Sequence, residues 1–448
     1  MNITVRAWLW MVVLVAMCSA CSQVTSAPTS TMVPTVAINT AVAAMNTSTT
    51  TPVTEATATP TGPATGYPAP TTENSLLPQD EEGVTAFHDC VVMPGLVGCD
   101  PQAPAIAARL AVQDPQMHRV LVLDLSSGEG WQINGEASSL AWLTNRIWLQ
   151  LTGPSSDQSW LFDFLTKSLS EPTGVFPVYD EDSTAAWIEE SGGDVVLRVQ
   201  QIGADAADTV FLHPHSPDTI YQPDRLFLLR SWVPGEYRVL AQVYTGGGDA
   251  MITGGELTLI DATTGEFTGL DVDAPITDAA EFVWNPQRPD ELAFLASREA
   301  GAPPRLSFIN LSSRHITYPK EEGLRVDGLA WHPDGARLTF AAHWDQPADA
   351  NRYKAPAIYA LDLGSGAVEQ LTQPPQNAED GRPGWSADGE VLLYGRWIQS
   401  APGRALMQVR ARRIADGQEW LLVELPAGEA DRVIGRIFWQ SYLTVTPW

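Results

Sequence analysis

An aromatic residue returns at a near-regular interval through most of this chain of 448 residues. The gaps between successive members are 37, 53, 52, 47, 54 and 54 residues, and the members are Trp142, Tyr179, Trp232, Trp284, Trp331, Trp385 and Trp439. We call these residues the anchors. A repeat of about 40–50 residues is the length of one four-stranded propeller blade. The spacing therefore predicts an all-β chain built from a series of similar sheets.

Two short motifs accompany the anchors in a fixed order. The first is a tight turn, as in Asp334-Gly335 after Trp331 and Asp388-Gly389 after Trp385. Gly accepts the positive φ that such hairpin turns need. The second places Asp four residues before Gly, at 124/128, 261/265 and 362/366, and Arg413 and Gly417 keep this spacing. The recurrence favours a β-propeller over a generic β-sandwich, with the anchors packed between neighbouring blades.

These motifs resemble the TolB-like, WD-like propeller repeat, which runs as an aromatic residue, a Ser-Pro-Asp-Gly turn, an apolar strand, Ile-Tyr-x-x-Asp and a Leu-Thr ending. The fullest match is segment 331–372, with His-Pro-Asp-Gly at 332–335, Ile358-Tyr359, Asp362 and Leu371-Thr372. The resemblance extends over about 105–448 and is strong from 232 to 425. It implies a propeller fold and points toward protein–protein interaction in the cell envelope. Propellers serve many functions, so the fold alone does not select one.

The number of anchors predicts seven four-stranded blades, with six or eight as alternatives. Segments 106–112, 119–125 and 131–133 look like three strands of a blade that lacks its first strand. The last anchor, in 436–440, has little chain after it. Pairing of the C-terminal strand with the incomplete N-terminal blade would close the ring and leave no exposed sheet edge.

The N-terminal part is predicted to be an export signal followed by a linker. Residues 1–21 resemble a lipoprotein signal, with Arg6, an apolar stretch at 7–17 that is too short to span a bilayer, and two small residues before Cys21. Cys21 is the expected lipidated residue, Cys18 is a second candidate, and an ordinary secretory signal is the alternative. Residues 22–82 are rich in Thr, Pro and Ser and are expected to form a disordered tether.

Residues 83–104 form a lead-in to the propeller, which we assign to 105–448. The lead-in contains Cys90 and Cys99, the only cysteines outside the signal region. Two cysteines this close in an exported protein are expected to form one disulfide.

Composition restricts the class of partner. The net charge of −27 disfavours nucleic acid and anionic lipid headgroups, so the expected contact with a membrane is through the N-terminal lipid only. No phosphate-binding, dinucleotide, metalloprotease or serine-hydrolase signature occurs, and we predict no cofactor, no metal and no catalytic residue. A closed propeller has no structural need to oligomerise, and a monomer is expected.

Three insertions, at 245–255, 343–355 and 398–404, follow the second strand of a blade and should lie on one face, around the channel mouth. Long loops on a rigid scaffold often carry binding residues. This face offers aromatic, acidic and basic groups that suit ligand binding. The candidates are His343, Trp344, Asp345, Asp349, Arg352, Tyr353 and Trp397.

The leading hypothesis is a lipid-anchored, extracytoplasmic propeller in the periplasm or on the cell surface. It would act as a non-catalytic scaffold that binds an envelope protein, a peptide or a glycan. The alternative is a propeller enzyme, a lyase or glycosidase acting on polysaccharide at the long-loop face. Asp345 or Asp349 would then be the acid/base and His343 a base or metal ligand, since glycoside hydrolysis needs two carboxyl groups about 5–10 Å apart. A sensor or assembly domain is a third hypothesis.

Overall fold

The computed structural model describes 84–88 and most of the chain from 103 to 447. Its longer gaps are at 144–147, 153–158, 171–176, 215–224, 246–254, 271–277, 298–304, 318–323, 345–355, 428–431 and 438–441. The chain divides into two compact units, Met1–Gly66 and Tyr67–Trp448, and every described residue belongs to the second. Within the described residues the secondary structure consists of strands and turns, and no helical segment has the length and apolar character needed to cross a bilayer.

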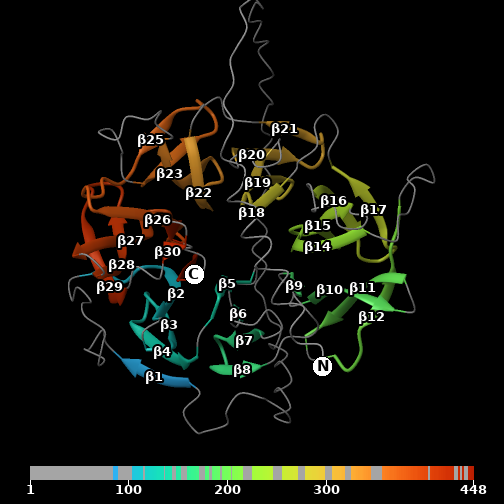
Figure 1. Ribbon diagram of the computed structural model, residues 1–448, viewed down its shortest axis with the longest axis horizontal. Coiled ribbons are helices and arrows are strands. Elements are labelled where there is room, and N and C mark those ends of the chain that lie inside the picture. The colour runs from blue at the N-terminus through green and yellow to red at the C-terminus, as the bar shows by residue number, and fades with distance from the viewer. Residues whose placement is uncertain are drawn as a thin grey trace, which may run out of the picture. The chain divides into compact units, whose positions relative to one another are not determined.

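Seven antiparallel sheets stand around a common centre, as the ring of arrows in Figure 1 shows. The seven-bladed propeller expected from the anchors is therefore confirmed. The first three blades are blade 1 (β32, β2, β3, β4 and β1), blade 2 (β5 to β8) and blade 3 (β9 to β12). Their strands are β1 (Val84–His88), β2 (Ala108–Asp114), β3 (Arg119–Asp124), β4 (Glu129–Asn134), β5 (Ser139–Trp142), β6 (Trp148–Thr152), β7 (Ser159–Asp163), β8 (Ser168–Ser170), β9 (Val178–Tyr179), β10 (Thr184–Ser191), β11 (Asp194–Gln201), β12 (Asp208–Phe211) and β32 (Leu443–Pro447).

The other four blades follow the chain in order. They are blade 4 (β14 to β17, with β13 added in parallel to β17), blade 5 (β18 to β21), blade 6 (β22 to β25) and blade 7 (β26 to β29). Their strands are β13 (His213–Pro214), β14 (Arg225–Trp232), β15 (Arg238–Thr245), β16 (Gly255–Asp261), β17 (Glu266–Gly269), β18 (Asp278–Trp284), β19 (Glu291–Ser297), β20 (Arg305–Asn310), β21 (His315–Thr317), β22 (Leu324–Trp331), β23 (Arg337–Trp344), β24 (Ala357–Asp362), β25 (Val368–Gln370), β26 (Ala378–Trp385), β27 (Val391–Ala401), β28 (Arg404–Arg413) and β29 (Glu419–Ala427).

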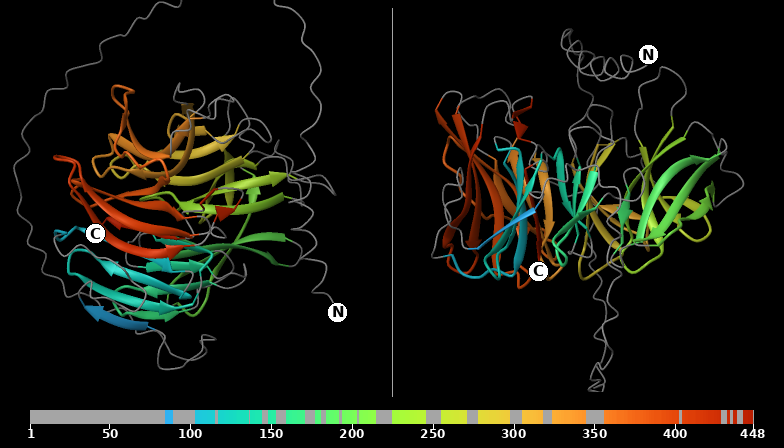
Figure 2. Two further views of the ribbon diagram at one scale, coloured as in Figure 1. Left: turned by 60° about the vertical axis from the view of Figure 1, so that its left-hand side comes forward. Right: turned by 90° about the horizontal axis from the view of Figure 1, so that it is seen from below.

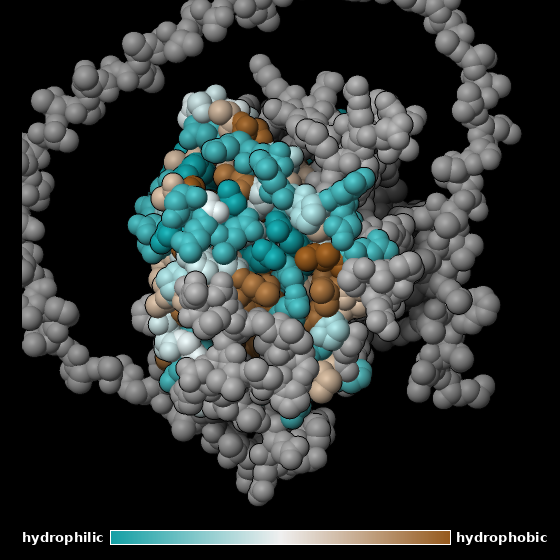
Figure 3. Space-filling view, turned by 90° about the vertical axis from the view of Figure 1, so that its left-hand side faces the viewer, coloured by the Kyte–Doolittle hydropathy of each residue, from teal (hydrophilic) through white to brown (hydrophobic). Residues whose placement is uncertain are grey.

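The hydrophobic core is divided among the interfaces between blades. Seven clusters of buried side chains occur in the described residues, and each joins two neighbouring blades, including blade 7 with blade 1. The edge-on view in Figure 2 shows the sheets standing side by side, so that each turns its faces to its neighbours. The outward side over blade 7 is mostly hydrophilic in Figure 3, with separate apolar patches. Stability thus depends on a continuous ring of sheet-to-sheet contacts.

The ring closes through the C-terminal strand, as expected from the incomplete first blade. β32 pairs antiparallel with β2, from Ala108 opposite Pro447 to Val112 opposite Leu443. It begins after the segment of the last anchor, 436–440. That region contributes to a separate two-stranded hairpin, β30 (Arg432–Val433) and β31 (Arg436–Ile437), while Trp439 lies outside the described residues. The alternating Leu-Thr-Val-Thr sequence of β32 supplies the closing strand instead.

Six anchors occupy the last residue of the first strand of a blade, which is the strand nearest the centre. Four of them donate the indole N–H to the preceding blade. The contacts run from Trp232 to the Val178 carbonyl (3.1 Å), from Trp284 to Ser231 Oγ (2.9 Å), from Trp331 to the Val283 carbonyl (2.9 Å) and from Trp385 to Thr339 Oγ1 (2.8 Å). The expectation that the anchors pack between blades is confirmed by these contacts.

The turn between the third and fourth strands repeats from blade to blade. Gly128, Gly265, Gly366 and Gly417 have φ of 71–78°, and their N–H groups bond the carbonyl four residues earlier. Lys167 (φ 60°) and Arg314 (φ 53°) take the same left-handed position in blades 2 and 5. The Lys167 ammonium lies 3.6 Å from the centroid of the Phe164 ring. The sequence did not reveal these two turns because their glycine is replaced.

Candidate functional site

Most of the site residues suggested by the sequence lie outside the part of the molecule that can be described. His343 and Trp344 end β23, and only their backbone is described. Asp345, Asp349, Arg352 and Tyr353 fall in 345–355, outside the described residues. The same holds for Cys21, Cys90 and Cys99. The lipid anchor, the disulfide and the long-loop site therefore stay predictions.

Trp397 is described, and its side chain is 2% exposed. It belongs to the cluster that joins blade 7 to blade 1, so its position gives it a packing role. The loop that we expected at 398–404 is also corrected by the structure. β27 continues to Ala401, which pairs with Arg404 across a short hairpin, so this segment is mainly strand. The long-loop hypothesis accordingly depends on the insertions after β15 and β23.

The described residues enclose a cavity of about 720 Å³ at the centre of the ring. All seven blades contribute to its wall, mainly through their first strands. Five anchors line it, namely Trp142, Tyr179, Trp284, Trp331 and Trp385. Pro286 and Pro333, from the turns that follow the first strands, line it too. The cavity thus lies at the end of the ring where the first strands turn into the second, and its size suits a small organic ligand.

The first strands of blades 4 to 7 each contain a β-bulge just before the anchor. Glu281, Gly328 and Arg382 lie in these bulges, three residues before Trp284, Trp331 and Trp385, with φ of 51°, 66° and 51°. A charged residue in this backbone region costs free energy and often marks a functional position. The bulges therefore place charged groups, in a defined conformation, beside the channel.

The bulges of blades 5, 6 and 7 contact one another. A Cβ atom on Gly328 would lie 3.2 Å from the Cα of Arg382, so a larger residue would require the two bulges to move slightly apart. The Gly328 N–H donates a hydrogen bond to the Glu281 carboxylate. Glu281 Oε1 is 4.0 Å from Arg382 Nη1. Three consecutive blades thereby hold one acid and one guanidinium together.

The Glu281 carboxyl has an unusual affinity for a proton. Burial is the main cause that raises its pKa, to about 7 from 4.5, and the nearby Asp327 carboxyl adds to the rise. The Arg382 guanidinium and the Gly328 N–H act in the opposite direction and lower the pKa. The Glu281 and Asp327 side chains also share a hydrogen bond, which raises the pKa of Glu281 further. This acid can therefore change protonation near neutral pH.

Two guanidiniums give the cavity a positive character. Arg230 and Arg382 are its only charged lining residues in the described part of the chain. Arg230 donates hydrogen bonds to Gln242 and Tyr244, and its guanidinium carbon is 5.6 Å from the centroid of the Phe282 ring. Among the described residues, no group of three or more His, Cys, Asp or Glu side chains is placed to hold a metal ion. The chemistry of this wall favours an anionic ligand over a cation.

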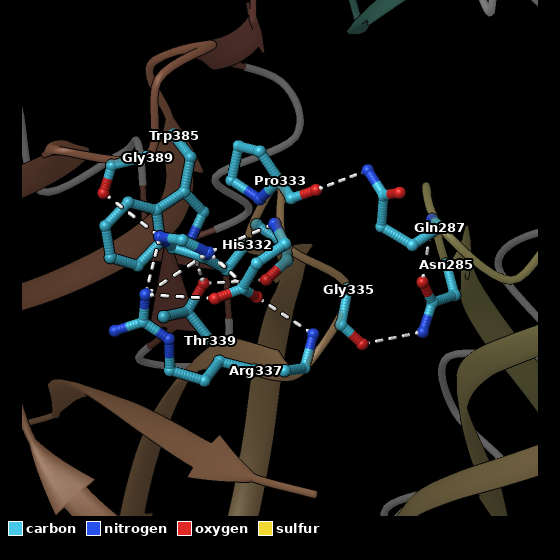
Figure 4. Close-up of polar contacts among 12 residues, drawn as sticks. Asn285, Gln287, His332, Pro333, Gly335, Arg337, Thr339, Trp385 and Gly389 are labelled. Atoms are coloured by element: carbon cyan, nitrogen blue, oxygen red, sulfur yellow. Dashed lines mark hydrogen bonds and ion pairs between the residues drawn. The ribbon is translucent and has the colours of Figure 1, made fainter. Parts of the chain in front are cut away.

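Polar contacts between turns fix the blades at the cavity rim (Figure 4). Asn285 Nδ2 of blade 5 donates a hydrogen bond of 2.9 Å to the Gly335 carbonyl of blade 6. Gln287 Nε2, also of blade 5, donates one of 2.9 Å to the Pro333 carbonyl. His332 Nε2 is 3.0 Å from the Gly389 carbonyl of blade 7. The His332 ring also lies edge-on to Trp385, with a centroid distance of 4.6 Å. These contacts hold the lining aromatic rings in one arrangement.

The turn that contains His332 also lowers the pKa of the Asp334 carboxyl at this rim. Burial alone would raise the pKa of Asp334, but the hydrogen bond from the Ala336 N–H and the contacts with His332 and Arg337 outweigh it and lower that pKa. Asp334 Oδ1 lies 2.9 Å from His332 Nδ1. The ionised carboxylate therefore supports the turn, and its role here is structural.

Little in the sequence indicated this site. Glu281, Arg382 and Arg230 belong to no motif, because a bulge residue can have any side chain that the channel accommodates. The available indication was the position of these residues within the repeat. When the repeats are superimposed on their anchors, Glu281, Gly328 and Arg382 fall three residues before the aromatic residue.

No protein-family model matches the sequence, and no curated protein does either. Among solved structures, a putative TolB from Agrobacterium tumefaciens is 13% identical, with a TM-score of 0.38, and the match covers 77% of this chain and 99% of that one. A TolB from Acinetobacter baumannii is 15% identical, with coverages of 63% and 67% and a TM-score of 0.34.

A structure from a study of two prolyl endopeptidases is 11% identical, with coverages of 73% and 51% and a TM-score of 0.47. The repeat and the seven blades make this chain a seven-bladed β-propeller in fold. At such low identity and TM-score the likenesses carry no argument about function, which has to be argued from the site.

Proposed function

We propose that this protein is a non-catalytic binding scaffold, held outside the cytoplasm by a lipid on Cys21, whose ligand enters the central cavity. The ligand would be, or would belong to, an envelope protein, peptide or glycan. One observation carries the proposal. The cavity of about 720 Å³ is built by all seven blades and is lined by aromatic rings and two guanidiniums. Such a wall is suited to recognition, since aromatic and Arg side chains are frequent binding anchors.

The cavity can be blocked without changing the fold of any blade. Ala141 is exposed on the first strand of blade 2 and lines the cavity. We expect Ala141→Trp to fill part of the space and to abolish capture of a ligand from envelope extract. Leu165→Trp is the matched control, because Leu165 is 59% exposed on the outer turn of blade 2. Capture that survives Ala141→Trp would contradict the proposal.

The predicted long-loop face is tested in the same assay. A variant in which 345–355 is replaced by a short turn should keep its ligand if the cavity is the site. Loss of the ligand in this variant alone would move the site to the long-loop face. The anchor is tested separately, since Cys21→Ala should transfer the protein from the membrane fraction to the soluble fraction.

A second candidate function, a lyase or glycosidase acting on polysaccharide, is favoured by the Glu281–Asp327 pair. The pKa of Glu281 is raised to about 7, which suits a general acid or base. Under this hypothesis the protein would release new reducing ends or unsaturated sugars from a polysaccharide panel. Glu281→Gln should then abolish turnover while ligand binding persists. If the unaltered protein shows no turnover, and Ala141→Trp abolishes capture of the ligand, the binding scaffold remains the proposed function.

A further inference from the structure

Three ionisable side chains from blades 5, 6 and 7 meet beside the cavity, and one of them, Arg382, lines it. We propose that the Glu281 and Asp327 carboxyl groups form a proton-operated switch that controls how much of the Arg382 charge is available to the cavity. While the two carboxyl groups share a proton, Arg382 keeps its positive charge toward the cavity. When that proton is lost, the Glu281 carboxylate pairs with Arg382 and neutralises it. This inference goes beyond the proposed function, because the switch operates without a ligand.

The first component of the switch is a hydrogen bond between two carboxyl groups. Glu281 of blade 5 and Asp327 of blade 6 hydrogen-bond to each other through their side chains. An ionised carboxyl group can only accept hydrogen bonds, so this bond exists only while one partner carries a proton. Asp327 is exposed, so the pair can exchange its proton with solvent. Loss of the proton breaks the bond, sets two like charges against each other and leaves the Glu281 carboxylate to find another partner.

The second component is the Arg382 guanidinium, which is positioned to receive the Glu281 carboxylate. Glu281 Oε1 lies 4.0 Å from Arg382 Nη1. A hydrogen bond between a guanidinium and an ionised carboxylate is shorter, at about 2.7–2.9 Å. The long contact therefore fits the protonated state of Glu281, and ionisation is expected to shorten it. Arg382 would then direct its charge to Glu281 and away from the cavity.

The backbone keeps these side chains within reach of one another in both states. Glu281 and Arg382 each have φ of 51° in their bulges, and Gly328, which lies between them, has φ of 66°. The Gly328 N–H donates a hydrogen bond to the Glu281 carboxylate, and a Cβ atom on Gly328 would lie 3.2 Å from the Cα of Arg382. Because the three bulges fix the backbone, a change in protonation is expected to move side chains and not blades.

The surroundings of Glu281 determine the pH at which the switch operates. Charged groups approach it from three strands, and they are Asp327 of β22, Arg382 of β26 and Arg230 of β14. The strand opposite the bulge, β19, contributes Ala293 and Leu295, which carry no charge. Burial is the main cause that raises the pKa of Glu281 to about 7, Arg382 opposes the rise and Asp327 adds to it. The switch should therefore change state near neutral pH, with Arg382 available below this pH and neutralised above it.

The test measures the reactivity of Arg382 directly. The full chain in mild detergent is treated with p-hydroxyphenylglyoxal, which modifies deprotonated guanidine groups, and the rates at Arg382 and Arg314 are measured by mass spectrometry. Arg314, exposed on an outer turn, is the reference in the same molecule and cancels the general effect of pH on the reagent. A neighbouring carboxylate makes a guanidinium hold its proton more firmly. We expect the ratio of the Arg382 rate to the Arg314 rate to fall by about threefold or more between about pH 6 and about pH 8.5, with its midpoint near pH 7.

Two variants assign the change to the carboxyl pair. Glu281→Gln should keep the high ratio at every pH, and Asp327→Asn should move the midpoint to lower pH, because Asp327 favours the protonated form of Glu281. Glu369→Gln, at an exposed acid on the outer strand of blade 6, is the matched control and should keep the unaltered profile. If Glu281→Gln fails to fold in a thermal melt, the shift in Asp327→Asn decides.

A ratio that is independent of pH in the unaltered protein would overturn the switch. A ratio that falls equally in folded Glu281→Gln, or a midpoint that does not move in Asp327→Asn, would do the same. Because no ligand is measured, these outcomes are separate from the capture assay with Ala141→Trp, which alone decides the proposed function.

Discussion

Arg314 occupies a backbone conformation that four other blades give to glycine. Its φ is 53°, whereas Gly128, Gly265, Gly366 and Gly417 fill the equivalent turn position. A left-handed conformation costs an L-residue about 1–2 kcal/mol, part of which is returned because glycine loses more entropy on folding. We expect Arg314→Gly to raise the free energy of unfolding by about 0.5–1 kcal/mol in a denaturant titration.

The reverse change serves as the internal control. A Cβ atom on Gly366 would meet nothing within 4 Å, so Gly366→Ala introduces backbone strain without a steric clash. This variant should lose about 1 kcal/mol. Destabilisation by both substitutions would show that the side chain of Arg314, and not its backbone, determines the stability of that turn.

Glu281 predicts a pH dependence of stability. Because its pKa in the folded protein is raised to about 7 from 4.5, ionisation of this group opposes folding. The penalty is fully present above pH 7 and disappears as the pH falls toward 4.5. At pH 8, Glu281→Gln should therefore be more stable than the unaltered protein, by on the order of 1–3 kcal/mol. The difference should vanish near pH 4.5, and a gap of equal size at both pH values would refute this account.

At the scale of single elements, the contribution of the anchors to stability can be tested by comparing two of them. Trp331 donates its indole N–H to the Val283 carbonyl of the preceding blade, whereas the buried Nε1 of Trp142 has no partner in the described residues. Trp331→Phe should lower the free energy of unfolding by about 1–2 kcal/mol more than Trp142→Phe, since it removes a hydrogen bond between two blades. Equal losses would mean that ring volume alone determines the role of the anchors.

Much of the element structure could be predicted from the sequence, because glycine turns and anchors have direct geometric causes. The strands of blades 4, 6 and 7 follow from the Asp-Gly turns and the Asp-x-x-x-Gly motif. Lys167 and Arg314 broke the second motif, so their turns were missed. The extension of β27 to Ala401 was missed too, because pairing with β28 decides where a strand ends. Bulges have no sequence signature, and for this reason the charged bulge residues Glu281 and Arg382 could not be predicted.

For the whole molecule, closure of the ring depends on a tight contact between blade 7 and β32. A Cβ atom on Gly384 would lie 2.5 Å from the Cβ of Val445. We expect Gly384→Ala to push the closing strand away and to lower the free energy of unfolding by about 1–3 kcal/mol. Gly269→Ala is the matched control, because nothing lies within 4 Å of its added Cβ. Limited proteolysis at the C-terminal strand should report the same difference, and equal resistance of both variants would contradict this role for Gly384.

The sequence predicted that the ends of the propeller pair, but it did not indicate which residues form the closing strand. The anchor spacing of 54 residues pointed to Trp439, yet β32 at Leu443–Pro447 carries no anchor at all. The unpaired edge of β2 determines which strand closes the ring, and a repeat pattern in the sequence contains no information about that edge.

The use of β32 as the first strand of blade 1 also sets an order of events during synthesis. β2 and β3 are synthesised early, but their sheet lacks the strand nearest the centre of the ring until residues 443–447 have been made. Blade 1, the first to be translated, is thus the last to be completed. Because this contact joins segments so distant along the chain, its loop-closure entropy should make it a slow step of folding. Until that step, the edge of β2 is available to any other strand, so the unfinished chain is exposed to aggregation at that edge.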